Sequence, residues 1–232
     1  MTIHCSDLTS DASIDARVSP EPARVAANAP VWSYRCLGKR VFDVVVVLMS
    51  LPFACLVIGG IAACIALSGG APFYTQDRVG RNGAFYRLWK LRTMVVDADQ
   101  RLQQHLESDP AARLEWDSTQ KLRDDPRVTR IGRFLRAASL DELPQLWNVL
   151  RGDMSLIGPR PMMPCQIPLY PGTAYYHLRP GISGSWQVSA RNASTFSERA
   201  VFDAEYDRKV CLREDLRILA ATVRVVLRRT GH

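Results

Sequence analysis

The sequence predicts an α-rich α/β fold: a membrane helix near the N-terminus, then a small cytosolic domain with a short β-hairpin and surface amphipathic helices. Three observations lead to this prediction: one long uncharged apolar run, two strand-like segments around a turn signal, and several segments with helical spacing of apolar residues. The composition agrees, because 232 residues with 47 % hydrophobic and 23 % charged residues are typical of a folded chain. A mean hydropathy of −0.09 excludes a polytopic membrane protein but allows one membrane segment.

The composition divides the chain into three parts. Residues 1–34 are rich in Ala, Ser, Asp and Pro without apolar periodicity, which predicts a disordered tail. Residues 35–70 contain an uncharged run over 44–67, and about 24 helical residues span about 36 Å, enough to cross a bilayer core of about 30 Å. Residues 71–232 have the mixed composition of a folded domain.

The flanks of the apolar run bear on its topology. Lys and Arg residues mark the cytoplasmic side of a membrane segment, and here they stand both before and after the run. Pro52, near the middle, removes a backbone hydrogen-bond donor and favours a kink or break. We therefore predict a re-entrant helix-break-helix that enters and leaves on the cytoplasmic face, with a single span as the competing topology. Asp43 is expected to pair with Lys39 or Arg40.

Short strands and helices are expected after this run. Strands over 73–76 and 84–91 flank the turn residues Arg81-Asn82-Gly83 and predict a hairpin. Helical spacing and breaker residues predict a loop-rich stretch over 158–184 and helices over 97–118 with a break at Asp109-Pro110, 128–138, 143–150 and much of 203–229.

The end of the last predicted helix has an apolar side and a basic side. The apolar side carries Leu216, Leu219, Val223 and Val226, and the basic side carries Arg217, Arg224 and Arg228. A basic amphipathic helix suits an anionic membrane surface. A helix packed on the core with a solvated basic face gives the same pattern, so both interpretations stay open here.

The overall charge and the cysteines bear on partners and location. The 30 Lys and Arg residues against 23 Asp and Glu residues give a net charge of +7, which favours anionic lipid, phosphorylated substrates or nucleic acid. No nucleic-acid-binding motif is recognised, and the apolar run is untypical of such proteins, so we expect no nucleic-acid partner. The six cysteines form no C-x-x-C pair, and we predict that all are reduced, as in the cytosol.

Two adjacent carboxylates, Asp141 and Glu142, stand directly before a predicted helix. A structural role is one explanation, because Asp141 as N-cap would place Pro144 at a tolerated third helical position. Nearby cations favour a second explanation: Arg136 precedes the pair, and Arg160 lies between two prolines in a stiff loop suited to phosphate binding. Paired carboxylates can hold Mg²⁺ beside substrate phosphates, and a carboxylate can attack phosphorus as a nucleophile.

Four blocks resemble, in order, those of the bacterial sugar transferase family, the monotopic polyprenyl-phosphate phosphoglycosyl transferases: KRVFD, QDRVGRNGAFYRLWKLRTM, DPRVTRIGRFLRAASLDELPQLWNVLRGDMSLIGPRP and RPGISGSWQVSARN. The resemblance extends over residues 37–230. It implies transfer of a sugar-1-phosphate from a UDP-sugar to undecaprenyl phosphate, with release of UMP, at the cytoplasmic face of the cell inner membrane. The last block is similar to members that start exopolysaccharide synthesis with galactose-1-phosphate; transfer of an N-acetylhexosamine-1-phosphate and an inactive membrane scaffold are the alternatives.

The resemblance also implies roles for five residues. Asp141 would be the nucleophile that carries the phospho-sugar intermediate, and Glu142 would assist proton transfer; both would hold Mg²⁺. The family's phosphate-binding positions correspond to Lys90, Arg136 and Arg160. The expected partners are therefore a UDP-sugar, undecaprenyl phosphate and inner-membrane lipid, with a homodimer left open.

Overall fold

The computed structural model describes residues 33–119, 122, 124–189 and 196–227, so nearly all of the predicted tail lies outside the described residues. Helices dominate, as predicted, and the strands of the described residues form two two-stranded sheets. In chain order the helices and strands are α1 (Lys39–Leu67), β1 (Phe73–Val79), β2 (Phe85–Leu91), α2 (Ala98–Ser108), α3 (Pro110–Thr119), α4 (Arg130–Ala137), α5 (Gln145–Arg151), β3 (Ser155–Ile157), α6 (Ala174–His177), β4 (Gly181–Ser183), α7 (Ser185–Ser189), α8 (Arg199–Lys209) and α9 (Leu212–Leu227). Short 3-10 or π-helical turns are η2 (Tyr34–Gly38), η3 (Arg81–Gly83), η4 (Leu140–Glu142) and η5 (Pro164–Leu169).

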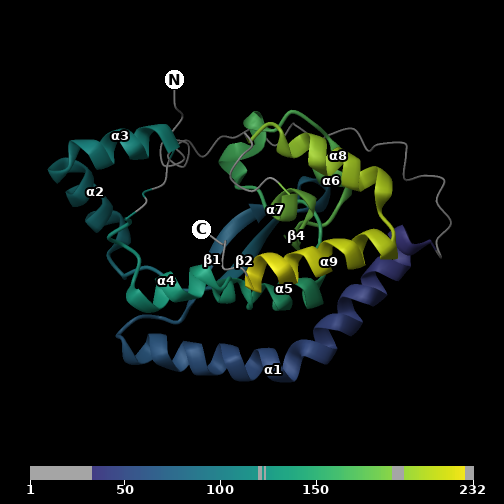
Figure 1. The fold of residues 1–232 in the computed structure, drawn as a ribbon, viewed down its shortest axis with the longest axis horizontal. Coiled ribbons are helices and arrows are strands. Elements are labelled where there is room, and N and C mark those ends of the chain that lie inside the picture. The colour runs from purple at the N-terminus through teal and green to yellow at the C-terminus, as the bar shows by residue number, and fades with distance from the viewer. Residues whose placement is uncertain (1–32, 120–121, 123, 190–195, 228–232) are drawn as a thin grey trace.

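Helix α1 continues through Pro52, the fourteenth of its 29 residues. Figure 1 shows the helix bending about midway along its length, so the predicted break is a kink within a continuous helix. Proline cannot donate its backbone hydrogen bond and its ring crowds the preceding turn, which accounts for a bend there. Only 11 % of the most apolar 18-residue stretch is buried, so α1 differs from the core helix of a soluble protein. By length and composition, α1 is suited to a membrane.

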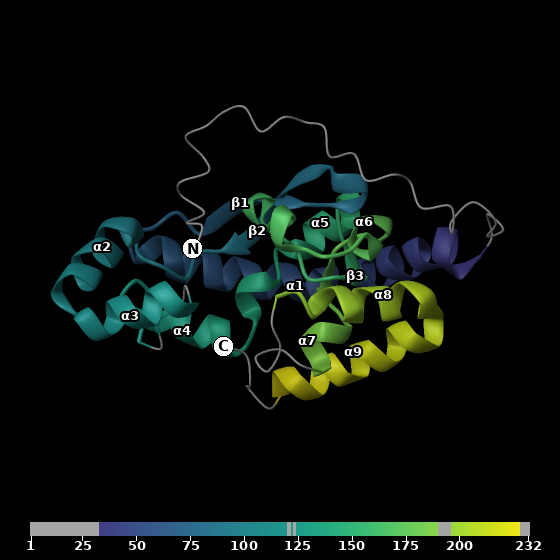
Figure 2. The ribbon, with the colours of Figure 1, turned by 90° about the horizontal axis from the view of Figure 1, so that it is seen from above.

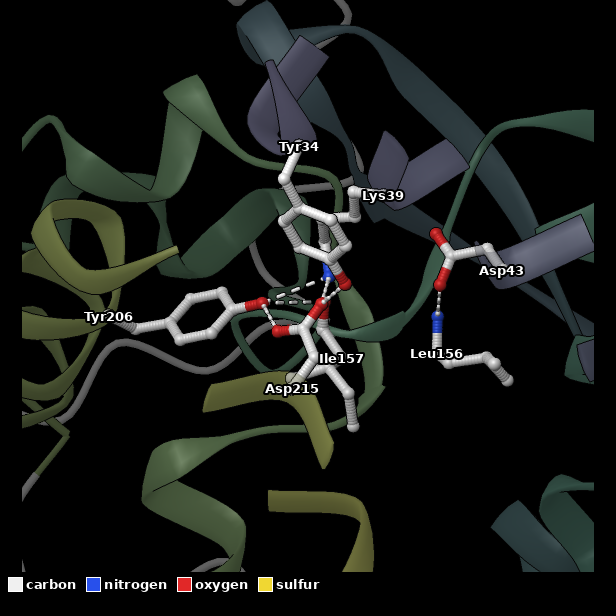
Figure 3. A network of polar contacts seen from close by, with 7 residues as sticks. All are labelled: Tyr34, Lys39, Asp43, Leu156, Ile157, Tyr206 and Asp215. Carbon is white, nitrogen blue, oxygen red and sulfur yellow. Dashed lines mark hydrogen bonds and ion pairs between the residues drawn. The ribbon is translucent and has the colours of Figure 1, made fainter. Parts of the chain in front are cut away.

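A network of polar side chains holds the N-terminal end of α1 on the folded domain (Figure 3). Lys39 Nζ donates to Asp215 Oδ2 of α9 at 2.6 Å and to the Tyr206 hydroxyl at 2.9 Å. The hydroxyls of Tyr34 and Tyr206 also donate to the Asp215 carboxylate, which is completely buried. Both carboxylate oxygens therefore accept hydrogen bonds, which offsets the cost of burying this charge.

Two further side chains near the start of α1 bind the domain. The Arg40 guanidinium donates to two carbonyl groups in the last turn of α5. Asp43 Oδ1 accepts the backbone N–H of Leu156 in β3 at 3.1 Å (Figure 3). The predicted pairing of Asp43 with Lys39 or Arg40 is confirmed in part. Burial raises the pKa of Asp43 and the nearby charge of Lys39 lowers it, but the described structure contains no hydrogen bond from either cation to Asp43.

The C-terminal half of α1 packs on a different part of the same domain. Ile65 is buried together with Leu91 of β2 and Leu135 of α4, and Leu140 packs against this cluster with three more residues of α1, namely Ile58, Ile61 and Ala62. The other side of the helix is exposed and apolar, with Met49, Phe53 and Leu56 at 80, 74 and 75 % exposure. Both ends of α1 are therefore bound to one folded domain while its middle presents apolar side chains outward.

The predicted hairpin is present, with β1 extending to Val79 instead of residue 76. Its turn contains Asn82 and Gly83 in the left-handed region, at φ 58° and 76°, as the Asn-Gly signal predicts. A parallel pair, β3 and β4, was not predicted, because strands of three residues show no periodicity. The residues next to these strands approach so closely that a Cβ on Gly158, which follows β3, would lie 2.2 Å from the carbonyl oxygen of Arg179, which precedes β4.

Helices α4, α5 and α9 lie in one layer next to α1 in Figure 1 and spread across that layer in Figure 2. Helices α2 and α3 form a pair at one end of the molecule in both views, separated at Asp109-Pro110 as predicted. Helix α9 packs on the core through Ile218 and, in part, Leu219, whereas Leu216 and Val223 of its predicted apolar side are about half exposed. The outward face of α9 therefore mixes apolar side chains with arginines.

The cysteine prediction is confirmed only in part. Among the described residues, Cys36, Cys55, Cys64 and Cys211 are free thiols. Cys165 is disulfide-bonded, so the prediction that all six are reduced is wrong, because sequence spacing does not show which side chains approach each other.

We predict that Lys39→Met lowers the free energy of unfolding by about 3 kcal/mol, because it leaves the buried Asp215 carboxylate without its cation. Denaturant unfolding of the detergent-solubilised protein, followed by tryptophan fluorescence, measures the change. Lys209→Met removes the exposed ion pair with Glu205 and serves as the matched control, with little expected effect. Equal effects of the two substitutions would contradict a stabilising role for the buried pair.

Candidate active site

Four of the five predicted site residues lie together where β2 meets the turn between α4 and α5. Lys90 Nζ lies 2.9 Å from Glu142 Oε1 and 3.9 Å from Asp141 Oδ2. Arg136, in the last turn of α4, lies close enough to Asp141 for the two charges to affect each other's pKa. The structure therefore places two carboxylates between two cations that are 46 residues apart in the chain.

A tight reversal of the chain presents the two carboxylates. Ser139 adopts the left-handed conformation, φ 55°, which turns the backbone between the end of α4 and η4. Asp141 lies within η4 and is 8 % exposed. Helix α5 begins only at Gln145, with Pro144 as its N-cap residue, so the alternative that Asp141 caps this helix is wrong.

Thr93 fixes α4 and its arginine, although the sequence did not single it out. Its carbonyl oxygen accepts the backbone N–H of Thr129, and its Oγ1 accepts a hydrogen bond from Arg136 Nε at 3.0 Å. Gly132 makes this contact possible, because a Cβ there would lie 2.0 Å from the Thr93 carbonyl oxygen. Thr93 and Gly132 belong to sequence blocks that resemble a known family, which is the one signal that could have identified them.

Burial and neighbouring charges shift the pKa values of the site in opposite directions. Burial raises the pKa of Asp141, and the negative charge of Glu142 raises it further. Lys90 and Arg136 oppose this rise because they stabilise the ionised carboxylate. Burial lowers the pKa of Arg136, although Asp141 counteracts it. Positive charge close to Asp141 therefore favours the ionised form of this buried carboxyl group.

The carboxylate oxygens of Asp141 and Glu142 are the type of ligand atom that Mg²⁺ binds. The described residues contain no group of three or more His, Cys, Asp or Glu side chains that could enclose a metal. Asp141 and Glu142 nevertheless both face Lys90 Nζ and offer hard oxygen donors on one side. Mg²⁺ characteristically binds one or two carboxylates and completes its coordination with water and substrate phosphates.

Arg160, the fifth predicted residue, lies in a second group of side chains. Its guanidinium carbon is 5.7 Å from the ring centroid of Trp186, and that of Arg199 is 4.2 Å from the same centroid. Burial lowers the pKa of Arg78, and charge repulsion from Arg160 lowers it further. The predicted cations are thus divided between the carboxylate pair and this second group.

Comparison with known families gives a match to the model described as bacterial sugar transferase, over residues 34–229. The chain belongs to the bacterial sugar transferase family. Its Asp141–Glu142 pair and the surrounding cations lie within the part that matches the family model.

Several curated proteins are similar to this chain in sequence. It is 46 % identical over 214 residues to a UDP-galactose-lipid carrier transferase of Erwinia amylovora and 43 % identical over 210 residues to an undecaprenyl-phosphate galactose phosphotransferase of Salmonella typhimurium. Both alignments cover 90 % of this chain but 44 % of the relative, so the chain spans less than half the length of these two proteins. It is also 42 % identical over 211 residues to exopolysaccharide production protein ExoY of Sinorhizobium fredii, covering 88 % of this chain and 91 % of ExoY.

We predict that Gly132→Ala lowers the free energy of unfolding by about 2 kcal/mol, because the added methyl group forces α4 away from the Thr93 backbone. Thermal and denaturant unfolding in detergent measure the loss. Gly60→Ala in α1 is the control, since a Cβ there meets no atom within 4 Å. A Gly132 variant as stable as the Gly60 variant would show that α4 does not depend on this close approach.

Proposed function

We propose that this protein transfers a sugar-1-phosphate from a UDP-sugar to undecaprenyl phosphate, releases UMP, and thereby initiates exopolysaccharide synthesis. One observation carries the proposal. The chain belongs to the bacterial sugar transferase family, and its carboxylate pair Asp141–Glu142 lies between the cations Lys90 and Arg136. Anionic diphosphate substrates need such cations to approach a carboxylate, and a carboxylate can form an acyl phosphate.

The proposed reaction has two displacement steps at one phosphorus atom. In the first, an Asp141 carboxylate oxygen attacks the phosphorus that bears the sugar, the bond to the bridging oxygen breaks, and UMP leaves with the bonding electrons. In the second, a phosphate oxygen of the lipid attacks the same phosphorus and the bond to Asp141 breaks, which restores the carboxylate. Two steps allow UMP to leave before the second anion binds, which lessens repulsion between the substrates.

Lys90 and Arg136 would hold the donor diphosphate against Asp141 and stabilise the charge that develops on its oxygens. Glu142 would assist proton transfer and keep Lys90 in place through their 2.9 Å contact. Asp141 and Glu142 are also the residues that would hold Mg²⁺. Bound there, the ion would neutralise diphosphate charge and so ease the approach of the Asp141 carboxylate.

The donor sugar is proposed to be galactose-1-phosphate. The RPGISGSWQVSARN block and the galactose named for two relatives support this choice. A relative from Caulobacter vibrioides, 40 % identical over 200 residues, is named a UDP-glucose:undecaprenyl-phosphate glucose-1-phosphate transferase, so similarity of this degree spans different sugars. N-acetylhexosamine-1-phosphate is the second candidate, and a panel of UDP-sugars separates them.

We further propose that α1 is re-entrant and places the site at the cytoplasmic face of the inner membrane. The kink at Pro52 supports this topology. Stronger support comes from the two ends of α1, because Lys39 binds α9 and Ile65 packs on β2 and α4 of the same domain. A helix that crossed the bilayer once would put its ends on opposite sides. Helices α4 and α9 expose apolar side chains, including Phe134 and Val223, and both helices also carry arginines. A surface of this kind suits contact with anionic lipid.

The transferase proposal predicts that Asp141→Asn abolishes UMP release, because the amide cannot act as the nucleophile. The measurement is UMP released by purified protein given Mg²⁺, undecaprenyl phosphate and a panel of UDP-sugars, and a loss of about 1,000-fold or more is expected. Asp99→Asn, on the exposed first turn of α2, is the control and should retain full activity. No UMP from any donor would favour an inactive scaffold, whereas an active Asp141→Asn would exclude this nucleophile.

The raised pKa of Asp141 predicts an acid limit to activity at a higher pH than an ordinary aspartate, near 4, would give. The ionised carboxylate is required, so kcat/KM should fall as the pH decreases through this raised pKa. Lys90 lowers the pKa of Asp141, and Lys90→Gln should therefore move the acid limb of the profile to higher pH. Arg133→Gln, which alters an exposed arginine of α4, should leave the limb in place. An acid limb that moves to lower pH in Lys90→Gln would contradict this electrostatic assignment.

A further inference from the structure

A side chain of α5 binds the outer edge of β2. Within the described residues β2 pairs with β1 alone, so no strand adjoins its other edge. Asn148 Oδ1 accepts the backbone N–H of Trp89 at 3.1 Å, and Asn148 Nδ2 donates to the carbonyl oxygen of Arg87 at 2.7 Å. An adjoining strand would bind the same two backbone groups, because both point to one edge of β2. The Asn148 carboxamide therefore takes the place of a third strand.

Neighbouring groups fix the direction of this carboxamide. Asn148 is completely buried, and its Nδ2 also donates to Asp153 Oδ2 at 3.2 Å. Its backbone carbonyl oxygen accepts the N–H groups of Gly152 and Asp153, which holds the residue at the end of α5. If the amide oxygen and nitrogen exchanged places, an acceptor would face the acceptors of Arg87 and Asp153. Both the position and the direction of the Asn148 amide are therefore determined.

The two elements that Asn148 joins each carry part of the candidate active site. Trp89 directly precedes Lys90 in β2, and α5 begins shortly after the turn that contains Asp141 and Glu142. The hydrogen bonds of Asn148 therefore connect the backbone beside the lysine to the helix beside the carboxylates. Lys90 Nζ lies 2.9 Å from Glu142 Oε1 and 3.9 Å from Asp141 Oδ2. A displacement of β2 relative to α5 would change both distances.

Apolar packing also joins β2 to α5, but it restricts their relative position less. Leu88 of β2 and Val149 of α5 belong to one buried cluster. Burial of apolar surface is not directional, so it changes little when one element slides along the other. Hydrogen bonds weaken steeply when donor and acceptor are misaligned. The two bonds of Asn148 therefore define where Lys90 lies along the strand relative to the carboxylate pair.

We infer that Asn148 is a positioning residue of this active site, which acts through the backbone of β2 to hold Lys90 against the Asp141–Glu142 pair. The inference rests on the proposed transferase function, in which Lys90 binds the donor diphosphate and stabilises the ionised Asp141 carboxylate. Asn148 is completely buried, so it acts through Lys90 and not by contact with a substrate. A buried asparagine that served stability alone would leave the interaction between Lys90 and Asp141 unchanged in any variant that still folds.

The kinetic test uses Asn148→Leu, which keeps the size of the side chain, adds no charge and removes both hydrogen bonds. In the full chain in detergent it should lower kcat/KM about tenfold or more at neutral pH. It should also move the acid limb to higher pH, as Lys90→Gln does, because a displaced lysine stabilises ionised Asp141 less. In the Lys90→Gln background the same substitution should cost less than about twofold, because the lysine through which it acts is gone.

Asp43→Ala is the matched control for lost stability. It removes another buried side chain that binds the backbone of a strand, in this case the N–H of Leu156 in β3. This contact is not part of the connection between β2 and α5. The variant should therefore keep kcat/KM within about twofold and leave the acid limb in place, even where its free energy of unfolding falls as much as that of Asn148→Leu.

Amine labelling keeps this inference separate from the transferase proposal. A short pulse of an acetylating reagent, followed by peptide mass spectrometry, measures the reactivity of each lysine without any turnover. Labelling of Lys90 relative to exposed Lys209 should rise about threefold or more in Asn148→Leu, because an ammonium group that loses its carboxylate partners gives up its proton more readily. Asp43→Ala should leave this ratio unchanged.

The outcomes are distinct. A rise in Lys90 labelling without turnover of any donor supports the positioning role and counts against the transferase proposal. Where a donor is turned over, the acid limb must move as well. Should Asn148→Leu unfold, Asn148→Ser applies the same test, because it is smaller and leaves room for water to bind the two backbone groups of β2. A folded variant with unchanged Lys90 labelling, or an active one with an unmoved acid limb, overturns the inference.

Discussion

The buried ion pair between Lys39 and Asp215 is the contact on which the architecture depends. It fastens the start of an apolar helix to the last helix of the domain, and Tyr34 and Tyr206 complete the hydrogen bonds of the carboxylate. Because a lone buried charge would cost several kcal/mol, this geometry permits few alternatives. Arg40 then holds the end of α5, so the first turns of α1 set the positions of elements far along the chain.

The other end of α1 links the membrane segment to the chemistry. Ile65 packs on Leu91, Leu135 and Leu140, and each of these precedes or follows a residue of the candidate site in sequence. One small apolar cluster thus fixes the backbone next to Lys90, Arg136 and Asp141. The proposed transfer of a sugar phosphate to a lipid would require the reactive group at the membrane surface, and this shared core would help to place it there.

Charge balance is the second organising constraint. Burial makes Asp141 harder to ionise and Arg136 harder to protonate, while their proximity opposes both effects. Arg160 and Arg199 lie together at Trp186, where burial lowers the pKa of Arg199 and the charge of Arg160 lowers it further.

The sequence by itself determined the apolar helix, the hairpin with its Asn-Gly turn, the break at Asp109-Pro110, and the carboxylate pair with its nearby cations. Each of these features depends on residues that lie within about 30 positions of one another in the sequence. They are the length of the apolar run, the residues of the turns, and the charged residues near the carboxylate pair. Only the tertiary structure decided the β3–β4 pair, the left-handed Ser139, the face of α9 that packs inward, and the position of Arg160 beside Arg199. These depend on contacts between segments distant in the chain, and a three-residue strand or a single backbone reversal leaves no periodic signal from which such contacts could be inferred.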